Sequence, residues 1–188
     1  MSTKTTSTTG WTMPGIGLGQ DALWGAGALK LPPIGTSKND VLKGDNGING
    51  FYGLGGNDTI YGYGGYDALA GGAGNDKLYG GRGNDNFIFD TKLNAKTNVD
   101  KIMDFKSSED DMISLSRKIF KKVGPAGGLK EEAFHVGKKA HDADDRIVYD
   151  KATGSLYYDP DGTGRAVKIK FATLVNKATL THDDFAIG

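Results

Sequence analysis

The stretch GLGGNDTIYGYGGYDALAGGAGNDKLYGGRGNDNFIF, residues 53–89, decides the fold, because an aspartate returns in it every nine residues. The full series has six members, and an apolar residue follows each member by two positions. A glycine precedes every member by two positions except the first, where Lys38 stands. The unit is therefore G-G-x-G-x-D-x-U-x, with U apolar, and so strict a period indicates a repeat architecture. The series consists of Asp40, Asn49, Asp58, Asp67, Asp76 and Asp85.

Each repeat combines a turn with a short strand. Its first six residues are turn material, because glycine reaches positive φ at low cost and lets backbone carbonyls approach closely. The last three residues, such as TIY or KLY, predict a strand whose middle side chain faces inward. Two turns and two strands, or eighteen residues, then form one coil of a flattened helix. The six copies begin at residues 35, 44, 53, 62, 71 and 80.

One apolar side chain per nine residues is too little burial to order such a coil, since ordering the backbone costs free energy at every residue. The turns indicate what supplies the rest. Each presents a carboxylate and inward carbonyl oxygens, without nitrogen or sulfur ligands, which suits a hard cation with six to eight oxygen ligands. Ca²⁺ fits better than Mg²⁺, which demands stricter octahedral geometry and keeps its waters. The sequence therefore predicts several calcium ions bound in the turns.

The repeats resemble the RTX family, the hemolysin-type calcium-binding nonapeptide proteins. The resemblance covers residues 35–88 and implies an all-β fold, a parallel β-roll in which calcium lies between turns eighteen residues apart. It also implies two well-formed sites, one on each edge of the roll. The first site takes Leu54, Gly56 and Asp58 with Gly71, Ala73 and Asp76, the turn that also contains Gly72 and Gly74; the second takes Tyr63, Gly65 and Asp67 with Gly80, Arg82 and Asp85.

Two further sites at the start of the roll depart from the pattern, and we expect them to be weaker. In one, Lys38 replaces a glycine; in the other, Asn49 supplies an oxygen without charge. At the far end, an additional acidic side chain either closes the last calcium turn or lies at an exposed strand end. The first weak site combines Thr36, Lys38 and Asp40 with Gly53, Gly55 and Asp58; the second combines Asp45, Gly47 and Asn49 with Gly62, Gly64 and Asp67; the closing candidates are Asp90, Asp100 and Asp104.

The chain after the repeats is expected to be rich in β-structure. The segments NFIFD, VDKIMDF, MISL, DRIVYD, SLYYD and RAVKIKFA read as strands, KATG as a hairpin loop, PDGTG as a turn, and residues 116–123 as a short amphipathic helix. This region resembles the post-repeat part of RTX exoproteins, including the C-terminal domain of serralysin-type proteases. The final DDFAIG resembles their uncleaved type I secretion signal, and a terminal edge strand is the alternative. We expect residues 1–34 to form an N-terminal segment or cap, 35–90 the roll, and 91–188 the post-repeat region.

Composition excludes several other classes of protein. The 23 basic and 23 acidic side chains cancel, so the charge favours neither nucleic acid nor a membrane surface as partner. Cysteine is absent, which excludes disulfides and thiolate metal sites. The N-terminus lacks an apolar segment typical of a Sec signal peptide, and no stretch is apolar enough to span a membrane. We therefore expect type I export to the cell exterior, where high calcium folds the roll.

Three other features carry alternatives. His141 with Asp142, Asp144 and Asp145 either binds a metal or forms a solvated acidic loop, which is favoured. Asp159, Asp161 and Gly162 resemble the start of an EF-hand loop, but Arg165 stands where glycine is needed, which favours a hairpin turn. A basic run either contacts an acidic polysaccharide or is a solvated face, which is favoured. It contains Arg117, Lys118, Lys121, Lys122, Lys138 and Lys139.

No H-E-x-x-H or G-x-S-x-G motif is present, so the catalytic groups of serralysins and of α/β-hydrolases are missing. Together with the Met1 start, this favours a secreted, non-catalytic calcium-binding protein with a structural, surface or interaction role. The expected partners are calcium, a type I exporter and an extracellular polysaccharide or cell surface. The alternative is the secretion and folding module of an extracellular protease, lipase or polysaccharide epimerase.

Overall fold

The computed structural model describes residues 33–188, so the expected N-terminal cap over residues 1–34 lies almost entirely outside the described part of the chain. Within residues 33–188 the protein is all-β, with fourteen strands and three short 3₁₀ helices. In that same range, no helix has the length and apolar character needed to cross a membrane.

The strands divide into those of the repeats and those that follow them. The repeats contribute β1 (Val41–Lys43), β2 (Asn49–Tyr52), β3 (Thr59–Gly64), β4 (Asp67–Ala70), β5 (Lys77–Arg82) and β6 (Asn86–Phe89). The later strands are β7 (Asp100–Ile102), β8 (Met112–Leu115), β9 (Gly127–Gly128), β10 (Phe134–Val136), β11 (Ile147–Asp150), β12 (Ser155–Tyr158), β13 (Ile169–Leu174) and β14 (Phe185–Ile187). The 3₁₀ helices are η1 (Ser107–Glu109), η2 (Glu131–Ala133) and η3 (His182–Asp184).

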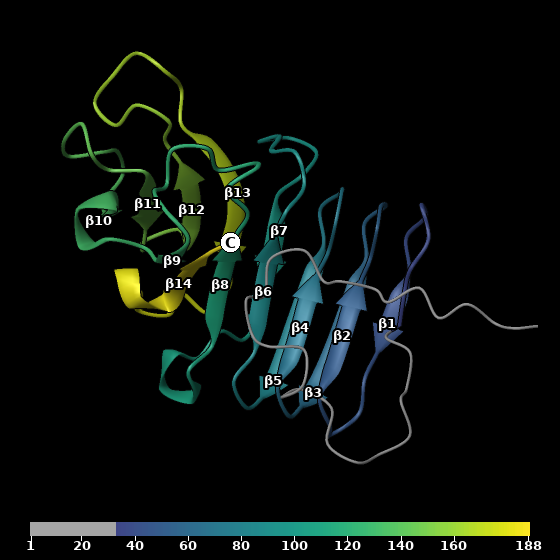
Figure 1. Ribbon diagram of the computed structural model, residues 1–188. Helices are drawn as coiled ribbons and strands as arrows, with labels where there is room; N and C mark the ends of the chain where they lie inside the picture. The colour runs from purple at the N-terminus through teal and green to yellow at the C-terminus, as the bar shows by residue number, and fades with distance from the viewer. Residues whose placement is uncertain (1–32) are drawn as a thin grey trace, which may run out of the picture.

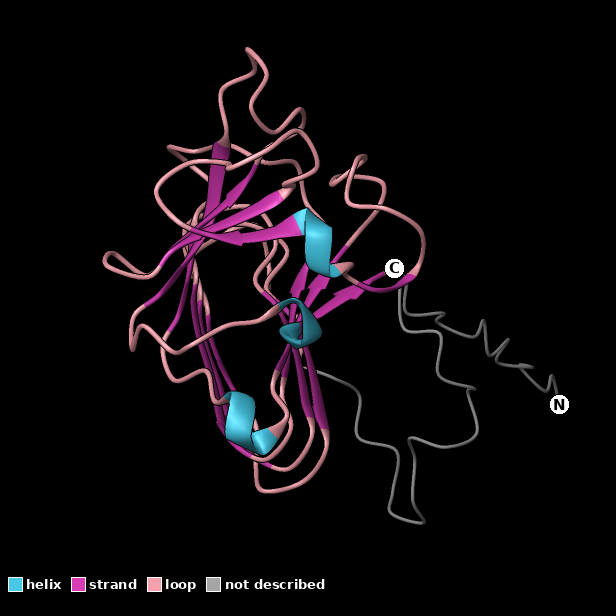
Figure 2. Ribbon diagram, turned by 90° about the vertical axis from the view of Figure 1, so that its left-hand side faces the viewer, coloured by secondary structure: helices cyan, strands magenta, loops and turns pink. Residues whose placement is uncertain are grey.

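Successive strands of the repeats alternate between two facing sheets, which Figure 1 shows side by side along the roll and Figure 2 shows as two layers joined by turns. One sheet begins β1-β3-β5-β7 and the other β2-β4-β6-β8, all parallel. In the first sheet Leu42 lies opposite Ile60, and Ile60 lies opposite Leu78. Equivalent residues are therefore eighteen apart, which confirms the predicted coil and the parallel β-roll.

The interior of the roll is a single stack of apolar side chains, one from each strand. Phe51, Leu69 and Phe87 face inward from one sheet, and Ile60 and Leu78 face them from the other. All five are at most 1% exposed. The neighbouring positions on each strand face outward, so the roll has a single apolar layer.

Beyond the repeats both sheets continue into a thicker core. The first sheet runs on through β13, β12, β11 and β10, and the second through β14 and β9. Between them Phe171 packs edge-to-face against Phe89 and Phe120, with ring centroids 5.1 Å apart in each case. Aromatic pairs of this kind stabilise a core beyond their buried area. The region thus closes one end of the roll (Figure 1) with a conventional hydrophobic core.

Most secondary-structure predictions for this region are confirmed. Every predicted strand segment contains a strand, and the KATG loop joins β11 to β12 in an antiparallel hairpin with Asp150 opposite Ser155. The predicted helix over residues 116–123 is wrong. That segment forms consecutive turns, with Phe120 N–H donating to Ser116 O, because burial of Phe120 and Val123 in the core outweighs helix propensity in so short a segment.

The C-terminal segment DDFAIG forms a strand, but the alternative of a terminal edge strand, given beside the secretion signal, is wrong. It contains β14, which pairs in parallel with β8 and antiparallel with β9, and so lies inside its sheet. Thr181 caps the preceding η3 with a capping box that it shares with Asp184. The segment is therefore held on both sides, and Phe185 is fully buried against Phe134.

Replacing Phe185 with alanine tests the structural role of this segment. We expect Phe185→Ala to lower the free energy of unfolding by about 3–5 kcal/mol, the usual cost of removing a buried phenylalanine ring. Urea unfolding in excess calcium measures the change. Asp183→Asn, an exposed site in the same segment, is the control and should leave stability nearly unchanged. Equal stability of both variants would contradict the packing described here.

Candidate calcium sites in the turns

The aspartates of the repeats form two ladders, one along each edge of the roll. Asp58 N–H donates to Asp76 Oδ1 at 2.7 Å, and Asp76 N–H donates in turn to Asp100 Oδ1 at 3.0 Å. On the other edge, Asp67 N–H donates to Asp85 Oδ1 at 3.1 Å, and Asp85 N–H donates to Asp111 Oδ1 at 2.9 Å. Each carboxylate therefore uses one oxygen to bind the coil before it. The first members, Asp40 and Asn49, join the ladders by donating to Asp58 and Asp67.

The second oxygen of the four inner repeat aspartates is buried without a hydrogen-bond partner among the described residues. This holds for Oδ2 of Asp58, Asp67, Asp76 and Asp85, whose side chains are at most 2% exposed. A buried carboxylate oxygen without a hydrogen bond or counter-charge is strongly unfavourable. These four atoms thus mark positions where a cation would relieve a large desolvation cost.

Backbone carbonyls converge on the same positions, and the lack of side chains on two glycines makes this possible. A Cβ on Gly53 would lie 2.3 Å from Asp58 Oδ2 and 2.2 Å from Gly71 O. A Cβ on Gly62 would lie 2.3 Å from Asp67 Oδ2 and 2.5 Å from Gly80 O. In each case a carboxylate oxygen and a carbonyl from the next coil meet in a cradle that any side chain would fill. The donors are all oxygen, which fits Ca²⁺.

The structure brings the predicted ligands of the two main sites together. Leu54 O accepts a hydrogen bond from Ala73 N–H at 3.0 Å, and Ala73 O accepts from Gly56 N–H at 2.9 Å, so these turns face one another. A Cβ on Gly72 would lie 2.5 Å from Leu54 O, and one on Gly74 would lie 1.7 Å from Gly56 O. The opposite edge repeats this arrangement with Tyr63, Gly65, Gly80 and Arg82, where Gly65 N–H donates to Arg82 O at 2.9 Å.

The two sites at the start of the roll differ from the main sites in the hydrogen bonding of two side-chain oxygens, Asp40 Oδ2 and Asn49 Oδ1. Asp40 Oδ2 accepts hydrogen bonds from both Thr36 N–H and Thr36 Oγ1, at 2.7 and 2.8 Å. Asn49 Oδ1 accepts from Asp45 N–H at 2.9 Å. These oxygens are therefore already partnered within their own turns. The predicted lower calcium affinity of these sites stays a prediction.

Among the closing candidates, Asp100 continues the first ladder. Asp104 accepts hydrogen bonds from Gly80 N–H and Gly81 N–H, at 3.0 and 3.1 Å, and Asp90 takes part in neither ladder. Sequence reasoning missed Asp111, which continues the second ladder. The signal was present, because Asp111 precedes Ile113 by two positions, as in the repeat, but the step from Asp85 is 26 residues instead of eighteen.

Burial shifts the titration of the ladder carboxyls. It raises the pKa of Asp67 and Asp85 to about 7, with an additional upward contribution from the neighbouring charges of Asp45 and Asp111 respectively. The pKa of Asp76 rises to about 6 for the same main reason, and burial also raises the pKa of Asp58. The folded roll without a bound cation therefore disfavours the ionised carboxylates at neutral pH.

The other candidate groups lie in loops of the C-terminal region. His141, Asp142 and Asp145 come together, with possible ligand atoms within 4.8 Å of one another, and Asp145 Oδ2 accepts from both His141 N–H and Asp142 N–H. Asp144 is not part of this group. Asp159, Asp161 and Gly162 lie in the loop between β12 and β13, where Asp161 Oδ2 accepts from Ala166 N–H. All six residues of the basic run are exposed.

Comparison with known proteins agrees with this geometry. Residues 34–69 and 64–90 match the model of the RTX calcium-binding nonapeptide repeat (4 copies). A search of curated proteins found no match. Among solved structures, the chain is similar to the AlgE6R3 subunit of the mannuronan C5-epimerase from Azotobacter vinelandii, with 29% identity, a TM-score of 0.54, and coverage of 81% of this chain and 80% of that chain. It is also similar to the AlgE6R2 subunit of the same enzyme, with 27% identity, a TM-score of 0.50, and coverage of 82% and 91%. The repeat segment of this protein, residues 34–90, is thus an array of RTX calcium-binding nonapeptide repeats folded as a parallel β-roll.

Proposed function

We propose that the protein is a secreted, non-catalytic module whose β-roll folds when it binds several calcium ions. The observation that carries this proposal is the set of four buried aspartate oxygens without partners, two of which, those of Asp58 and Asp67, lie beside a backbone carbonyl from the next coil. Metal-binding free energy becomes folding free energy when the site does not exist in the unfolded chain. The roll, with its single apolar stack, depends on that contribution.

Two ions would occupy the main sites. One would lie between the turns of Asp58 and Asp76, and the other between the turns of Asp67 and Asp85. In each site two carboxylates and carbonyls from both turns supply the oxygen ligands that calcium prefers. The weaker sites at the start of the roll would add ions only at higher calcium concentration.

Secretion by a type I exporter follows from the same dependence. RTX repeats are typical of secreted proteins, and a chain that needs millimolar calcium would stay unfolded in a low-calcium cytosol and fold outside. The C-terminal signal belongs to this proposal as an unfolded recognition segment. After export, the same residues would form β14.

A role beside an extracellular polysaccharide is supported by the outer face of the roll. Tyr61 stacks on Tyr79 there, with ring centroids 4.7 Å apart and planes at 18°. Lys77 and Lys101 lie opposite one another on the adjacent β5 and β7 and are exposed. Partly exposed aromatic rings beside ammonium groups suit a sugar polymer that carries carboxylates. The alternative function is that of a folding module of a polysaccharide epimerase. The observation that supports it is the similarity to repeat subunits of such an enzyme.

Calcium should order the roll cooperatively. The negative charge of the ladder aspartates should determine how much calcium is needed for folding. We expect chelator to abolish most of the β-signal of residues 35–90 in far-ultraviolet circular dichroism, and millimolar calcium to restore it. Asp76→Asn removes a buried charge and should raise the calcium concentration at the folding midpoint about tenfold or more. Asp144→Asn, an exposed aspartate outside the repeats, is the control. A circular dichroism spectrum that is unchanged by chelator would contradict the proposal.

The pH dependence of the metal-free protein gives a second test. Asp67 and Asp85 have a pKa of about 7 in the fold and about 4 when unfolded, so protonation of these carboxyls favours the fold. This contribution is complete below about pH 4 and is lost as the pH rises through about 7. We therefore expect metal-stripped protein to gain β-structure and resistance to urea between pH 8 and pH 5. In saturating calcium the change should be much smaller, and greater stability of stripped protein at pH 8 would contradict the proposed repulsion.

The polysaccharide role is tested by removing the two lysines. We expect Lys77→Ala with Lys101→Ala to weaken binding of the calcium-loaded protein to a mannuronate polymer several-fold at low salt, because two ammonium groups near the polymer carboxylates are lost. Lys92→Ala with Lys96→Ala changes the net charge equally and lies in the exposed segment between β6 and β7, outside the basic run, so it is the matched control. Equal weakening by both pairs would leave only nonspecific attraction, and the sheet face would be rejected.

A further inference from the structure

The two edges of the roll end where the eighteen-residue coil lengthens. The step from Asp76 to Asp100 is 24 residues, and the step from Asp85 to Asp111 is 26 residues. The additional residues place side chains of nonrepetitive sequence over the last turn on each edge. Thr91 Oγ1 donates to Gly72 O at 2.7 Å on the first edge. On the second edge the group in this position is charged.

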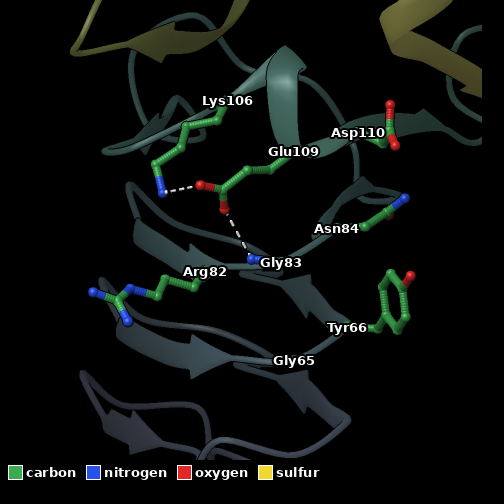
Figure 3. A pocket seen from close by; sticks show the side chains of 8 residues that line it. All are labelled: Gly65, Tyr66, Arg82, Gly83, Asn84, Lys106, Glu109 and Asp110. Carbon is green, nitrogen blue, oxygen red and sulfur yellow. Dashed lines mark hydrogen bonds and ion pairs between the residues drawn. The ribbon is translucent and has the colours of Figure 1, made fainter.

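That group is the ammonium of Lys106. Its Nζ donates to Gly81 O at 2.9 Å and to Glu109 Oε1 at 3.0 Å. Glu109 Oε2 in turn accepts from Gly83 N–H at 2.8 Å, and Figure 3 shows both side chains over this turn, in the pocket at the end of the roll. Gly81 is the second residue of its repeat, equivalent to Leu54 and Tyr63. The carbonyl at this position is one that the proposed calcium sites use.

The surroundings of Lys106 are those of a cation site. Asp85 is fully buried with Oδ2 unpartnered, and Asp104 lies on the same turn through Gly80 and Gly81. Asp111 is 3% exposed and accepts from Lys106 N–H through Oδ2 at 2.8 Å. With Glu109, four acidic side chains meet at this end of the roll. Lys106 is the ammonium that hydrogen-bonds within this group.

We propose that Lys106 is a built-in cation that takes the place of the next calcium ion in the row of Asp67 and Asp85. The inference rests on the proposed calcium binding in the preceding turns. The ammonium donates to the carbonyl that an ion would coordinate, and it supplies positive charge that chelation cannot remove. The row therefore ends at the turn of residues 80–85, and the turn of residues 104–111 stays attached to the roll without metal.

Removing the charge should convert this end of the roll into an additional calcium site. Lys106→Met keeps an unbranched apolar side chain and removes the ammonium. Gly81 O and Glu109 then lose their hydrogen bonds to Nζ, and the three aspartates lose the nearby positive charge. We expect native mass spectrometry in calcium to count one more ion in this variant than in the unaltered protein. Lys106→Arg keeps the cation and should give the unaltered count. Lys101→Met, an exposed lysine on β7, is the matched control and should also give the unaltered count.

A second measurement does not depend on the variant's folding. In the calcium-loaded natural chain, acylation of amines should modify Lys106 several-fold more slowly than Lys101, because the Lys106 amine is held in two hydrogen bonds. An unchanged ion count in folded Lys106→Met, or equal acylation rates for the two lysines, would overturn the inference. An unaltered protein that binds no calcium at all would instead overturn the proposed function, and this inference with it.

Discussion

The rest of the structure depends on one constraint, the burial of a carboxylate that has only one of its two oxygens satisfied. In every inner coil the Oδ1 of the repeat aspartate accepts the N–H of the equivalent residue in the preceding coil, and Oδ2 is left inside the turn. The same side chain thus joins neighbouring coils and faces the proposed cation. Stacking and metal binding are therefore coupled, because neither oxygen can reach its partner unless the coils are in register. The glycine at the first repeat position belongs to the same constraint, since a Cβ there would fill the space that these oxygens share.

The two parts of the described chain draw stability from different sources. The roll has one apolar side chain per strand, and its turns carry buried charge. The region after residue 90 has crossed aromatic rings and a conventional apolar core, built from Phe120, Tyr158 and Phe171, and Phe89 of β6 packs against it. Because β7 and β8 belong to both parts, they offer the repeats two strand edges that are held by the apolar core. We expect folding of the roll to begin at these edges and to proceed toward β1, since each coil needs a formed neighbour.

The similarity to repeat subunits of an epimerase concerns this whole arrangement and not the repeats alone. Coverage of about four fifths of the chain extends well past residue 90, so the strands that close the roll are part of the shared architecture. In this protein the closing segments also carry the groups that cover the last turns, Thr91 on one edge and Lys106 with Glu109 on the other. These groups differ in charge, which makes the two edges of the roll chemically unequal although their repeats are alike.

The sequence by itself determined the roll, because its information is local and periodic. The nine-residue unit indicates which residues form the turn, which side chain faces inward and which position carries the carboxylate. The eighteen-residue register follows without knowledge of any distant contact.

Prediction was less successful where the period stops. Residues 116–123 have a helical pattern but form turns, since burial of Phe120 and Val123 decides their conformation. Asp111 was missed because 26 residues separate it from Asp85. The edge-strand alternative for DDFAIG was wrong because nothing near this segment in sequence indicates β8 and β9 as its neighbours. The contact of Lys106 with Gly81 was equally hidden, since 25 residues separate the two in the chain. Only the tertiary structure decided these features, because each depends on contacts between segments that the repeat does not relate and that chain folding brings together.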